Sequence, residues 1–319
     1  MGHRTGRPRA TVRVCPMMAA ERVRSGRAAM LWMVAGAVCF AAMGALTHAL
    51  GPRCHWLLTA LVRAVVMFVV TAGLAVAGGV RLAVWRPGTL WVRSLAGSLS
   101  LICNFYALTR LPVAEALTLT NTYPLWIVVL ALVLLGQWPR RIELGALGSG
   151  MAGVVLIEQP HWGGERLAIG VALLGAASTS VALLGLHRLR DVDPRAVVAH
   201  FAGVASLVCL GVMAWVPGVL PRGVPDGTTL GLLLGVAVSG TGGQYCLTRA
   251  YALGRPASLA IVGLLQVVFA AVVDVVVWGR RLDPMVVVGF GLVGLPSAAL
   301  GMVAGSKLRA AGRGVRGQG

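Results

Sequence analysis

Long apolar runs separated by short polar segments make up most of this chain. They cover residues 28–50, 57–80, 89–108, 113–136, 142–158, 167–187, 196–216, 228–250, 257–278 and 284–304. At about 1.5 Å per residue, a helix of roughly 20 residues crosses a hydrocarbon core about 30 Å thick. Backbone groups in lipid must be paired within their own segment, so the runs are expected to be helices. The pattern predicts an all-α membrane protein with about ten transmembrane helices.

Composition supports the same class. The chain has 319 residues, of which 57% are hydrophobic and 12% charged, whereas about 25% of residues are charged in a typical soluble domain. The net charge of +18 would suit a nucleic-acid binder, but the basic residues lie at the ends of apolar runs and at the termini, as membrane-topology signals do. We therefore expect membrane lipid, and no nucleic acid, around the protein. The cysteines show no CxxC spacing, so no metal site, cofactor or disulfide framework is expected.

The basic residues also predict an orientation. With a cytoplasmic N-terminus, the cytoplasmic side collects the N-terminal arginines, Arg81, Arg86, Arg140, Arg141, Arg188, Arg190, Arg195, Arg249, Arg255 and the tail from Lys307 onward. The opposite side holds Arg53, Arg110, Arg166, Arg222, Arg280 and Arg281. This excess predicts a multi-pass protein of the cytoplasmic (inner) membrane with both termini in the cytoplasm. The run at 28–50 is too long for the core of a cleavable signal peptide, so it is expected to stay as the first span. Met17 or Met18 is an alternative start to Met1.

An internal repeat divides the chain into two halves. Tyr106-Ala-Leu-Thr-Arg110 matches Tyr251-Ala-Leu-Gly-Arg255, about 140 residues later. The apolar run after each segment ends in glycine followed by polar residues, and the next span contains GxGxxG. Each half has an odd number of spans, so the second half is expected to enter the membrane upside down, as in transporters with inverted repeats. The predicted organisation is a basic tail (1–27), a first five-helix repeat (28–158), a second (167–304) and a basic C-terminal tail (305–319).

The GxGxxG patterns lie inside apolar spans, not after a strand, so they do not indicate a dinucleotide site. Small residues spaced like Gly145, Ser149 and Gly153 predict instead that helices approach closely there.

At these residues the chain resembles the EamA domain of the drug/metabolite transporter superfamily. The likeness rests on the alanine-rich entry and mid-helix proline of the fourth span (Tyr123-Pro124), its exit at Gly136, the glycine-rich fifth span and the arginine of the second span, Arg63. It covers both halves and implies the fold of a transporter, without indicating the substrate.

Two departures from the family pattern accompany this resemblance. The family commonly has Gly-Glu where this chain has Gly136-Gln137 and Gly279-Arg280. The second half also has Val267 where the first has Pro124. We therefore expect the two halves to contribute unequally to function.

Polar residues are concentrated in the first half of the fourth span. Glu115, Thr118 and Thr122 form one stripe, with Asn121 at its edge. Exposed to lipid they would cost free energy, so they are expected to face other helices or a wet cavity. Pro124 is expected to bend the helix, and the neighbouring Trp126 is a candidate lining residue of the cavity. This segment is interpreted as one wall of a polar pathway.

The eighth span carries a second stripe, formed by Thr241, Gln244, Tyr245 and Thr248. It either faces the fourth-span stripe across a cavity or forms ordinary interhelical hydrogen bonds. Asn104 in the third span and Gln266 in the ninth are carboxamides that either orient a substrate or serve packing.

Charged residues within the spans are further candidates. Glu115 and Asp274 either couple transport to protons or reach the membrane interface. Arg63 holds an anionic substrate, pairs with an acid or extends to the headgroups.

Together these patterns predict a secondary transporter that moves a small metabolite, such as an amino acid, a nucleoside or an amphiphilic compound, by alternating access, in the export direction. The substrate is expected between the fourth, eighth and ninth spans, with help from the third. No ATP-binding or catalytic motif is present, so no enzymatic activity is expected. The alternatives are a membrane-embedded enzyme and a structural or sensory subunit. Proton coupling and a homodimer remain open.

Overall fold

The computed structural model describes residues 16–316 apart from short gaps at 83–84, 86, 161–164, 217 and 220–224. Arg86, Arg222 and residues 1–15, which entered the orientation argument, lie outside the described residues.

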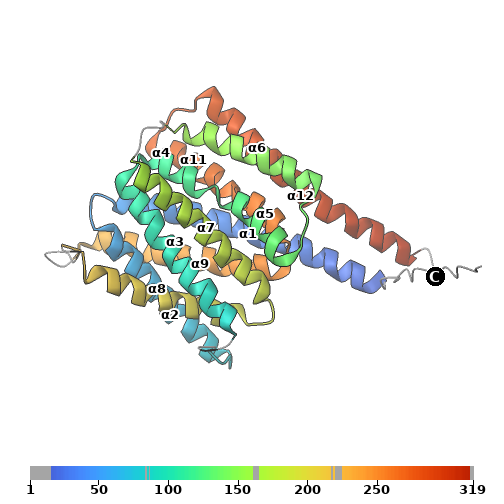
Figure 1. The fold of residues 1–319 in the computed structure, drawn as a ribbon, viewed down its shortest axis with the longest axis horizontal. Helices are drawn as coiled ribbons and strands as arrows, with labels where there is room; N and C mark the ends of the chain where they lie inside the picture. The colour runs from blue at the N-terminus through green and yellow to red at the C-terminus, as the bar shows by residue number, and fades with distance from the viewer. Residues whose placement is uncertain are drawn as a thin grey trace, which may run out of the picture.

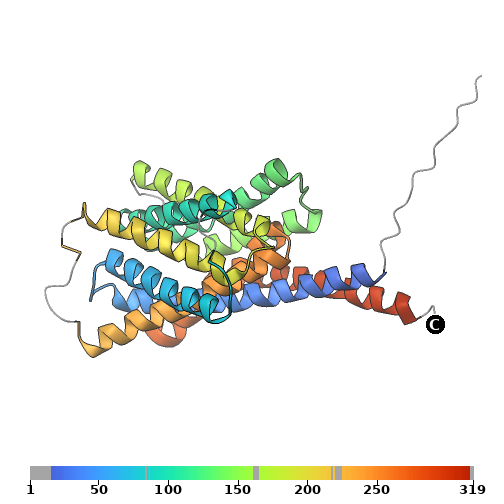
Figure 2. The same ribbon diagram turned by 90° about the horizontal axis from the view of Figure 1, so that it is seen from below.

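Helices account for all the regular structure in the described ranges. They are α1 (Pro16–Leu50), α2 (Trp56–Ala77), α3 (Gly88–Arg110), α4 (Val113–Thr120), α5 (Tyr123–Leu135), α6 (Arg141–Glu158), α7 (Arg166–Arg188), α8 (Pro194–Met213), α9 (Gly227–Leu253), α10 (Pro256–Gly263), α11 (Leu265–Trp278) and α12 (Pro284–Arg316). The terminal helices are longer than expected, since α1 begins and α12 ends inside segments predicted as tails. The far ends of these two helices project from the same end of the bundle (Figures 1 and 2).

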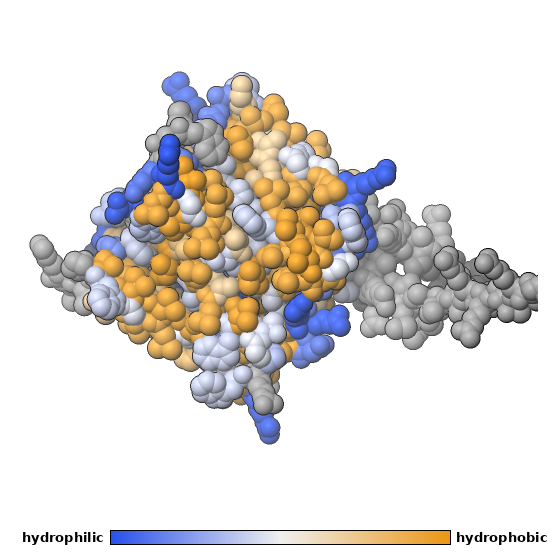
Figure 3. Space-filling model, viewed as in Figure 1, coloured by the Kyte–Doolittle hydropathy of each residue, from blue (hydrophilic) through white to orange (hydrophobic). Residues whose placement is uncertain are grey.

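Eight segments in the described residues are long and apolar enough to cross a membrane: Ser25–Leu50, Trp56–Ala77, Ala114–Leu135, Arg166–Arg188, Pro194–Met213, Gly227–Leu253, Pro256–Trp278 and Pro284–Met302. Two further helices, α3 and α6, coincide with predicted spans but are more polar. Large apolar side chains such as Val133, Leu207 and Leu295 are exposed on the outside of the bundle, and one apolar face fills the middle of Figure 3. The protein is a multi-pass membrane protein.

The fourth predicted span is broken into α4 and α5 at Asn121 and Thr122, with Pro124 in the first turn of α5. The last carbonyls of α4 accept hydrogen bonds from the amides of the break, Asn121 N to Leu117 O at 2.9 Å and Thr122 N to Leu119 O at 3.1 Å. Polar side chains add a second bond to each, because Asn121 Nδ2 donates to the carbonyl of Leu117 at 2.8 Å and the Thr122 hydroxyl to that of Leu119 at 2.6 Å. Part of the predicted polar stripe therefore caps a helix end.

The ninth span is also broken, at Leu264 between α10 and α11, although Val267 replaces the proline there. The two halves are more alike in this respect than the sequence suggested.

The ends of these two spans are alike as well. Gly136 after α5 and Gly279 after α11 have φ of 61° and 65°, in the left-handed region that glycine adopts without strain. In both, the following amide donates six residues back, Gln137 N to Ala131 O at 3.1 Å and Arg280 N to Asp274 O at 3.3 Å.

The most extensive helix contacts join α1 with α9, α3 with α7, α6 with α12 and α2 with α8. Each pair joins the first half of the chain to the second. In the two repeats α1 corresponds to α7, α2 to α8, α3 to α9 and α6 to α12. The pair α1–α9 therefore corresponds to the pair α7–α3, and the pairs α2–α8 and α6–α12 each correspond to themselves. The interface between the halves is therefore the centre of the molecule.

Small residues bring α6 and α12 together. A Cβ added to Gly153 would lie 2.8 Å from the carbonyl oxygen of Gly289, and the Ser149 hydroxyl donates to the carbonyl of Leu292 at 2.8 Å. The predicted close approach is confirmed for Gly153 and Ser149. It is wrong for Gly145, where a Cβ would meet nothing within 4 Å.

Candidate functional site

Arg63 on α2 points into the interface between the halves. A Cβ added to Gly240 of α9 would lie 2.7 Å from Arg63 Nε, so the guanidinium fits there only because residue 240 has no side chain. Gly240 is at the middle of α9 (Gly227–Leu253). Arg63 Nε is buried and has no hydrogen-bond partner among the described residues. A cation is thus held near the middle of a membrane-spanning helix.

Arg63 lines a narrow gap between α2, α3 and α8 that has no room for a water molecule. The other lining residues are apolar: Ala60, Ala64, Met67, Leu101, Phe201 and Ala205.

A second arginine, Arg93 on α3, lies against the ring of Phe201. It is only 2% exposed, and its Cζ lies 3.9 Å from the centroid of the Phe201 ring, a cation–π contact. In the part of the chain that the structure describes, its Nε and Nη1 have no hydrogen-bond partner. Sequence reasoning missed Arg93, although a basic residue inside the apolar run at 89–108 is the same signal that singled out Arg63.

The acidic side chains do not neutralise these two arginines. In the described ranges the ion pairs are Arg53–Asp226, Arg110–Glu165, Arg190–Asp191, Arg195–Asp193, Arg255–Glu143 and Arg280–Asp274. Neither Arg63 nor Arg93 is a member of any of them.

The eighth-span stripe divides into satisfied and unsatisfied groups. Thr241 and Thr248 donate to the carbonyls of Ala237 and Gln244 in their own helix, at 2.7 and 2.8 Å. Tyr245 OH accepts from Arg249 Nε at 3.2 Å. Gln244 differs, since its Nε2 is buried and finds no partner in the described residues. It lies one turn from Gly240 on the same side of α9, next along the helix from the Arg63 contact.

Asn104 on α3 is the fourth such group. Its Oδ1 is buried without a partner within the described ranges, and a Cβ on Gly175 of α7 would lie 2.6 Å from that oxygen. Its Nδ2 donates to Ser100 Oγ at 3.5 Å, and Ser100 hydrogen-bonds Thr179 of α7. We refer to Arg63 Nε, Arg93 Nε and Nη1, Asn104 Oδ1 and Gln244 Nε2 as the interface polar atoms.

The two candidate acids differ in their surroundings. Glu115 on α4 is fully buried, and neither of its oxygens has a partner among the residues described. Thr118, three residues on, donates to its own helix at Ala114. Asp274 pairs with Arg280 at 3.6 Å, and both side chains are partly exposed. Asp274 therefore belongs to a partly exposed ion pair, whereas Glu115 is a buried acid with no cationic partner among the described residues.

The remaining candidates do not line this gap. Trp126 is 39% exposed and shares the outer side of α5 with Val129 and Val133, away from buried Pro124. That it covers the substrate stays a prediction. Gln266 is half-buried in the first turn of α11.

The site expected between the fourth, eighth and ninth spans stays a prediction, and the helix contacts bring a different set of polar groups together. The fourth-span helices α4 and α5 pack mainly on α7, whereas the eighth-span helix α9 packs mainly on α1 and α2, so the two predicted stripes do not share a main partner. The interface polar atoms instead lie on α2, α3 and α9, against α7 and α8.

Several known proteins with similar sequences are named as transporters. The model of the EamA-like transporter family matches residues 27–159 and 165–300. The pseudopaline exporter CntI of Pseudomonas aeruginosa (strain UCBPP-PA14) is 29% identical over 215 residues, 66% of this chain and 74% of that protein. An uncharacterized transporter of Helicobacter pylori (strain J99 / ATCC 700824) is 31% identical over 172 residues, 52% of this chain and 57% of that protein.

A solved crystal structure shares the fold. It has a TM-score of 0.75 and 21% identity, and the match covers 88% of this chain and 98% of the other. Both halves of the chain are matched by the same family model, in agreement with the repeat found in the sequence. The chain belongs to the EamA-like transporter family.

Proposed function

We propose that ten spans, arranged as two inverted five-span repeats, form a secondary transporter that moves a small metabolite by alternating access. The helix pairs of one half correspond to those of the other, which supports a repeat of the same fold. Because each half has an odd number of spans, the two halves would have opposite orientations in the membrane. The far ends of α1 and α12 project from the same end of the bundle. This supports an even number of spans, because both chain ends then lie on one side of the membrane.

The observation that carries the proposal is the position of the interface polar atoms. Each belongs to a helix of one half and lies at, or one helical turn from, a contact with the other half. A buried polar group left unpaired costs about 1–3 kcal/mol, and ionisable groups inside membrane spans are most often functional. A substrate between the halves would supply the missing partners.

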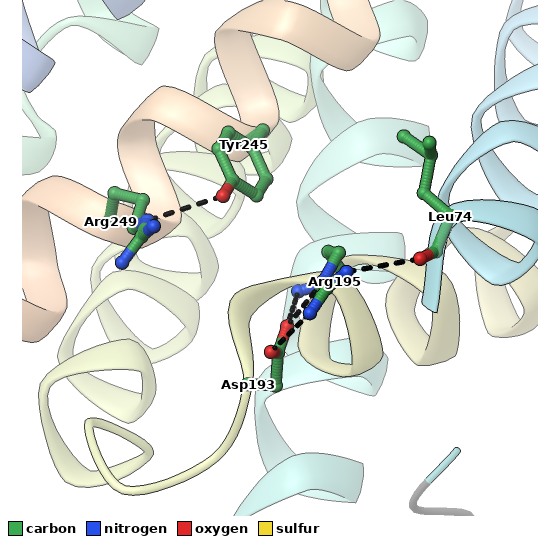
Figure 4. A network of polar contacts seen from close by, with 5 residues as sticks. All are labelled: Leu74, Asp193, Arg195, Tyr245 and Arg249. Carbon is green, nitrogen blue, oxygen red and sulfur yellow. Dashed lines mark hydrogen bonds and ion pairs between the residues drawn. The ribbon is translucent and has the colours of Figure 1, made fainter. Parts of the chain in front are cut away.

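The two ends of the bundle hold contacts that fit an alternating opening. At the end where α2 finishes, Arg195 at the start of α8 donates to the carbonyl of Leu74 at 3.1 Å and to Asp193, while Arg249 donates to Tyr245 on α9 (Figure 4). At the other end, Arg53 pairs with Asp226 at 3.5 Å. The contacts Arg195–Leu74 and Arg53–Asp226 each join one half to the other. In the proposed cycle one set breaks while the other holds.

Direction and coupling complete the proposal. The relative named as an exporter supports export, and the excess of basic residues supports both termini in the cytoplasm. Glu115, buried and without a cationic partner in the described residues, is the candidate group for proton coupling.

Flux in liposomes tests the function. Purified protein should move at least one solute from a panel of amino acids, nucleosides and organic ions across a sealed membrane without altering it chemically. Chemical conversion of a solute would indicate an enzyme, and the absence of flux for every class would contradict the proposal.

Gln244→Leu tests the location of the site. The leucine removes the buried amide and has a similar volume. We therefore expect transport to be lost, while the amount of protein in the membrane and its thermal stability stay as in the wild type. Thr241→Val is the matched control, because that hydroxyl bonds only within its own helix, and we expect transport to be retained. Normal flux in Gln244→Leu would remove α9 from the site.

A further inference from the structure

We propose that two equivalent ion pairs between the halves form in turn: Arg255–Glu143, which is present in this structure, and Arg110–Asp283, which forms when the transporter adopts its opposite state. The proposal rests on the alternating access proposed above. It adds the residues that stabilise each of the two states.

The repeat supplies the same two charged positions twice. Arg110 and Arg255 each end a Tyr-Ala-Leu-x-Arg segment, just before α4 and α10. Glu143 and Asp283 each end a segment of two arginines, a branched aliphatic residue and an acid, at the starts of α6 and α12. When each residue is replaced by its counterpart in the other repeat, the pair Arg255–Glu143 becomes Arg110–Asp283. In inverted repeats the two pairs belong to opposite ends of the interface.

The Arg255–Glu143 pair is formed and partly enclosed by the protein. Arg255 Nε lies 3.3 Å from Glu143 Oε1, and the Glu143 side chain is 0% exposed. The Ser258 hydroxyl and the backbone amide of Arg140 also donate to this carboxylate. Because Glu143 belongs to the first half while Arg255 and Ser258 belong to the second, these bonds hold the halves together at this end.

The equivalent pair is not formed. The Asp283 carboxylate accepts a hydrogen bond from the backbone amide of Met285 at 2.9 Å, and within the described ranges Asp283 is in no ion pair. Arg110 is paired with Glu165 at 3.8 Å, and these two side chains are 56% and 48% exposed. Exposed pairs of this kind contribute little to stability, so Arg110 can exchange its partner at low cost.

The helices that carry these residues differ between the halves in the same way. α10 packs on α5 and α6, whereas its counterpart α4 makes no comparable contact with α11 or α12 in the part of the chain that the structure describes. Other contacts match, since α4 packs on α7 as α10 packs on α1, and α5 packs on α7 as α11 packs on α1. The repeats therefore take up different arrangements around the two ion-pair positions, as one state of an alternating transporter requires.

Exchange of these two arrangements gives the opposite state. α4 would approach α11 and α12 and bring Arg110 to Asp283, while α10 would move away from α5 and α6 and expose Glu143 to water. Water at the opened end replaces the hydrogen bonds that Glu143 loses, so its charge is not left buried and unpaired. One ion pair is exchanged for its equivalent, which keeps the two states close in free energy.

Distances between spin labels, measured by electron paramagnetic resonance, test the exchange without a known substrate. The protein is made cysteine-free and reconstituted into liposomes. A first label pair at Pro112→Cys and Leu282→Cys reports on Arg110–Asp283, and a second at Trp138→Cys and Leu253→Cys reports on Arg255–Glu143. All four labelled positions are exposed, and none belongs to either ion pair.

Each label pair should show two populations. We expect mostly long distances with a short minority for the first label pair, and mostly short distances with a long minority for the second. A single long distance in the first label pair, unchanged in every variant described below, would overturn the proposal.

A charge variant then connects the two populations. Glu143→Gln weakens the ion pair that is formed here, so it should raise the ratio of short to long distances in the first label pair about tenfold and lower that ratio in the second, because a charge-assisted hydrogen bond contributes about a factor of ten or more. Asp226→Asn is the matched control, since it weakens an exposed ion pair that also joins the halves, and it should not raise the ratio in the first label pair. The same rise in both variants would indicate general loosening and overturn the proposal.

Exposed positions keep the test independent of whether Glu143→Gln folds. Arg110→Gln and Asp283→Asn should each lower the short-to-long ratio of the first label pair about tenfold. Glu165→Gln, which removes the present partner of Arg110, should not lower it. A loss of the short population in Glu165→Gln but not in Asp283→Asn would overturn the proposed pair.

The outcome is separate from that of the flux assay. Solute flux through a protein whose first label pair never shortens would overturn the exchange of ion pairs and leave the transport function standing. Exchange of the two populations in a protein that moves no solute would support the ion pairs and contradict the transport function.

Discussion

At the scale of the residue, the fate of a polar group in this protein depends on whether it can bond within its own helix. Threonine hydroxyls reach the carbonyl four residues back, as Thr118 and Thr241 do, so their positions in a polar stripe say little about a site. In Gln244 and Asn104 an amide atom remains buried without a partner in the described part of the chain. The sequence shows the stripe but not this difference, which depends on what packs against each side chain.

The buried carboxylate of Glu143 contrasts with the two buried arginines, because it is fully paired. It is 0% exposed and accepts hydrogen bonds from Arg255, Ser258 and the backbone amide of Arg140. It joins the start of α6 to the start of α10. Arg255 is the last residue of the second repeated segment, Tyr251-Ala-Leu-Gly-Arg255.

Removal of Arg255 should therefore be costly. Arg255→Ala leaves the buried Glu143 charge without its cation. Because Arg255 itself is 38% exposed, the cost should lie below the roughly 3–5 kcal/mol of breaking a fully buried pair. Arg53→Ala is the comparison, because Arg53 and Asp226 are 45% and 60% exposed and such pairs contribute about 0–1 kcal/mol. Thermal unfolding in detergent should rank Arg255→Ala well below both wild type and Arg53→Ala. Equal midpoints for the two variants would mean that Glu143 is not held by Arg255.

At the scale of the element, the sequence predicted the helices well and their interruptions in part. Each apolar run is helical, as the lack of backbone partners in lipid requires. Pro124 marked the break between α4 and α5 in advance. The break at Leu264 had no proline to mark it. Gly263 lies directly before the break, and a Cβ there would meet the side chain of Tyr123 in the first half. The glycines of the fifth and tenth spans show the same limit: the pattern predicts close approach, and the rotation of the helix decides that Gly153 faces α12 while Gly148 does not.

Leucine at these two glycines should separate the cases. At Gly153 the new side chain meets backbone, the Gly289 carbonyl oxygen, at 2.8 Å from its Cβ, so α6 and α12 must move apart at a cost of about 1–3 kcal/mol. At Gly148 a Cβ meets nothing within 4 Å. Gly153→Leu should lower the unfolding midpoint and Gly148→Leu should not. A loss of stability in both variants would place Gly148 in a contact as well.

The start of α8 should respond to acid in a predictable direction. Arg195 hydrogen-bonds the Asp193 carboxylate, and this holds the pKa of Asp193 below its ordinary value of 3.8, with Arg249 adding a smaller effect in the same direction. A depressed folded-state pKa means that the pair stabilises the fold above the unfolded value and that this stabilisation is lost as pH falls through the folded value.

Asp193→Asn keeps the helix cap that Asp193 provides to the Arg195 amide and removes the charge. Its unfolding midpoint should lie slightly below that of the wild type at pH 7, and the difference should disappear as the pH falls below about 4. A difference that persists unchanged in acid would assign the effect to the cap instead of the charge.

At the scale of the whole molecule, the sequence predicted an all-helical membrane protein with two similar halves, because these follow from run lengths and from a repeated order of features. The total of ten spans and the inverted relation of the halves stay predictions. The sequence did not predict which helices pair. In lipid no hydrophobic force distinguishes one apolar helix surface from another, so partners are chosen by small-residue contacts and a few polar groups. Gly240 beside Arg63 and Gly175 beside Asn104 are such contacts, and each depends on two segments distant in sequence. For the same reason the candidate site was expected on the fourth, eighth and ninth spans. The interface polar atoms lie instead on α2, α3 and α9, which are the second, third and eighth spans.

The inverted relation of the halves can be tested at two equivalent loops. The loop after Gly136 and the loop after Gly279 follow the same left-handed glycine cap, and in two inverted repeats they must open to opposite sides of the membrane. In a cysteine-free background, Trp138→Cys and Leu282→Cys place thiols at positions that are 77% and 49% exposed. With both termini in the cytoplasm, a membrane-impermeant maleimide should label Leu282→Cys in intact cells and Trp138→Cys only after permeabilisation. The reverse result would invert the orientation and keep the repeat, whereas labelling of both from the same side would contradict the inverted repeat and, with it, a substrate site shared between two mirrored halves.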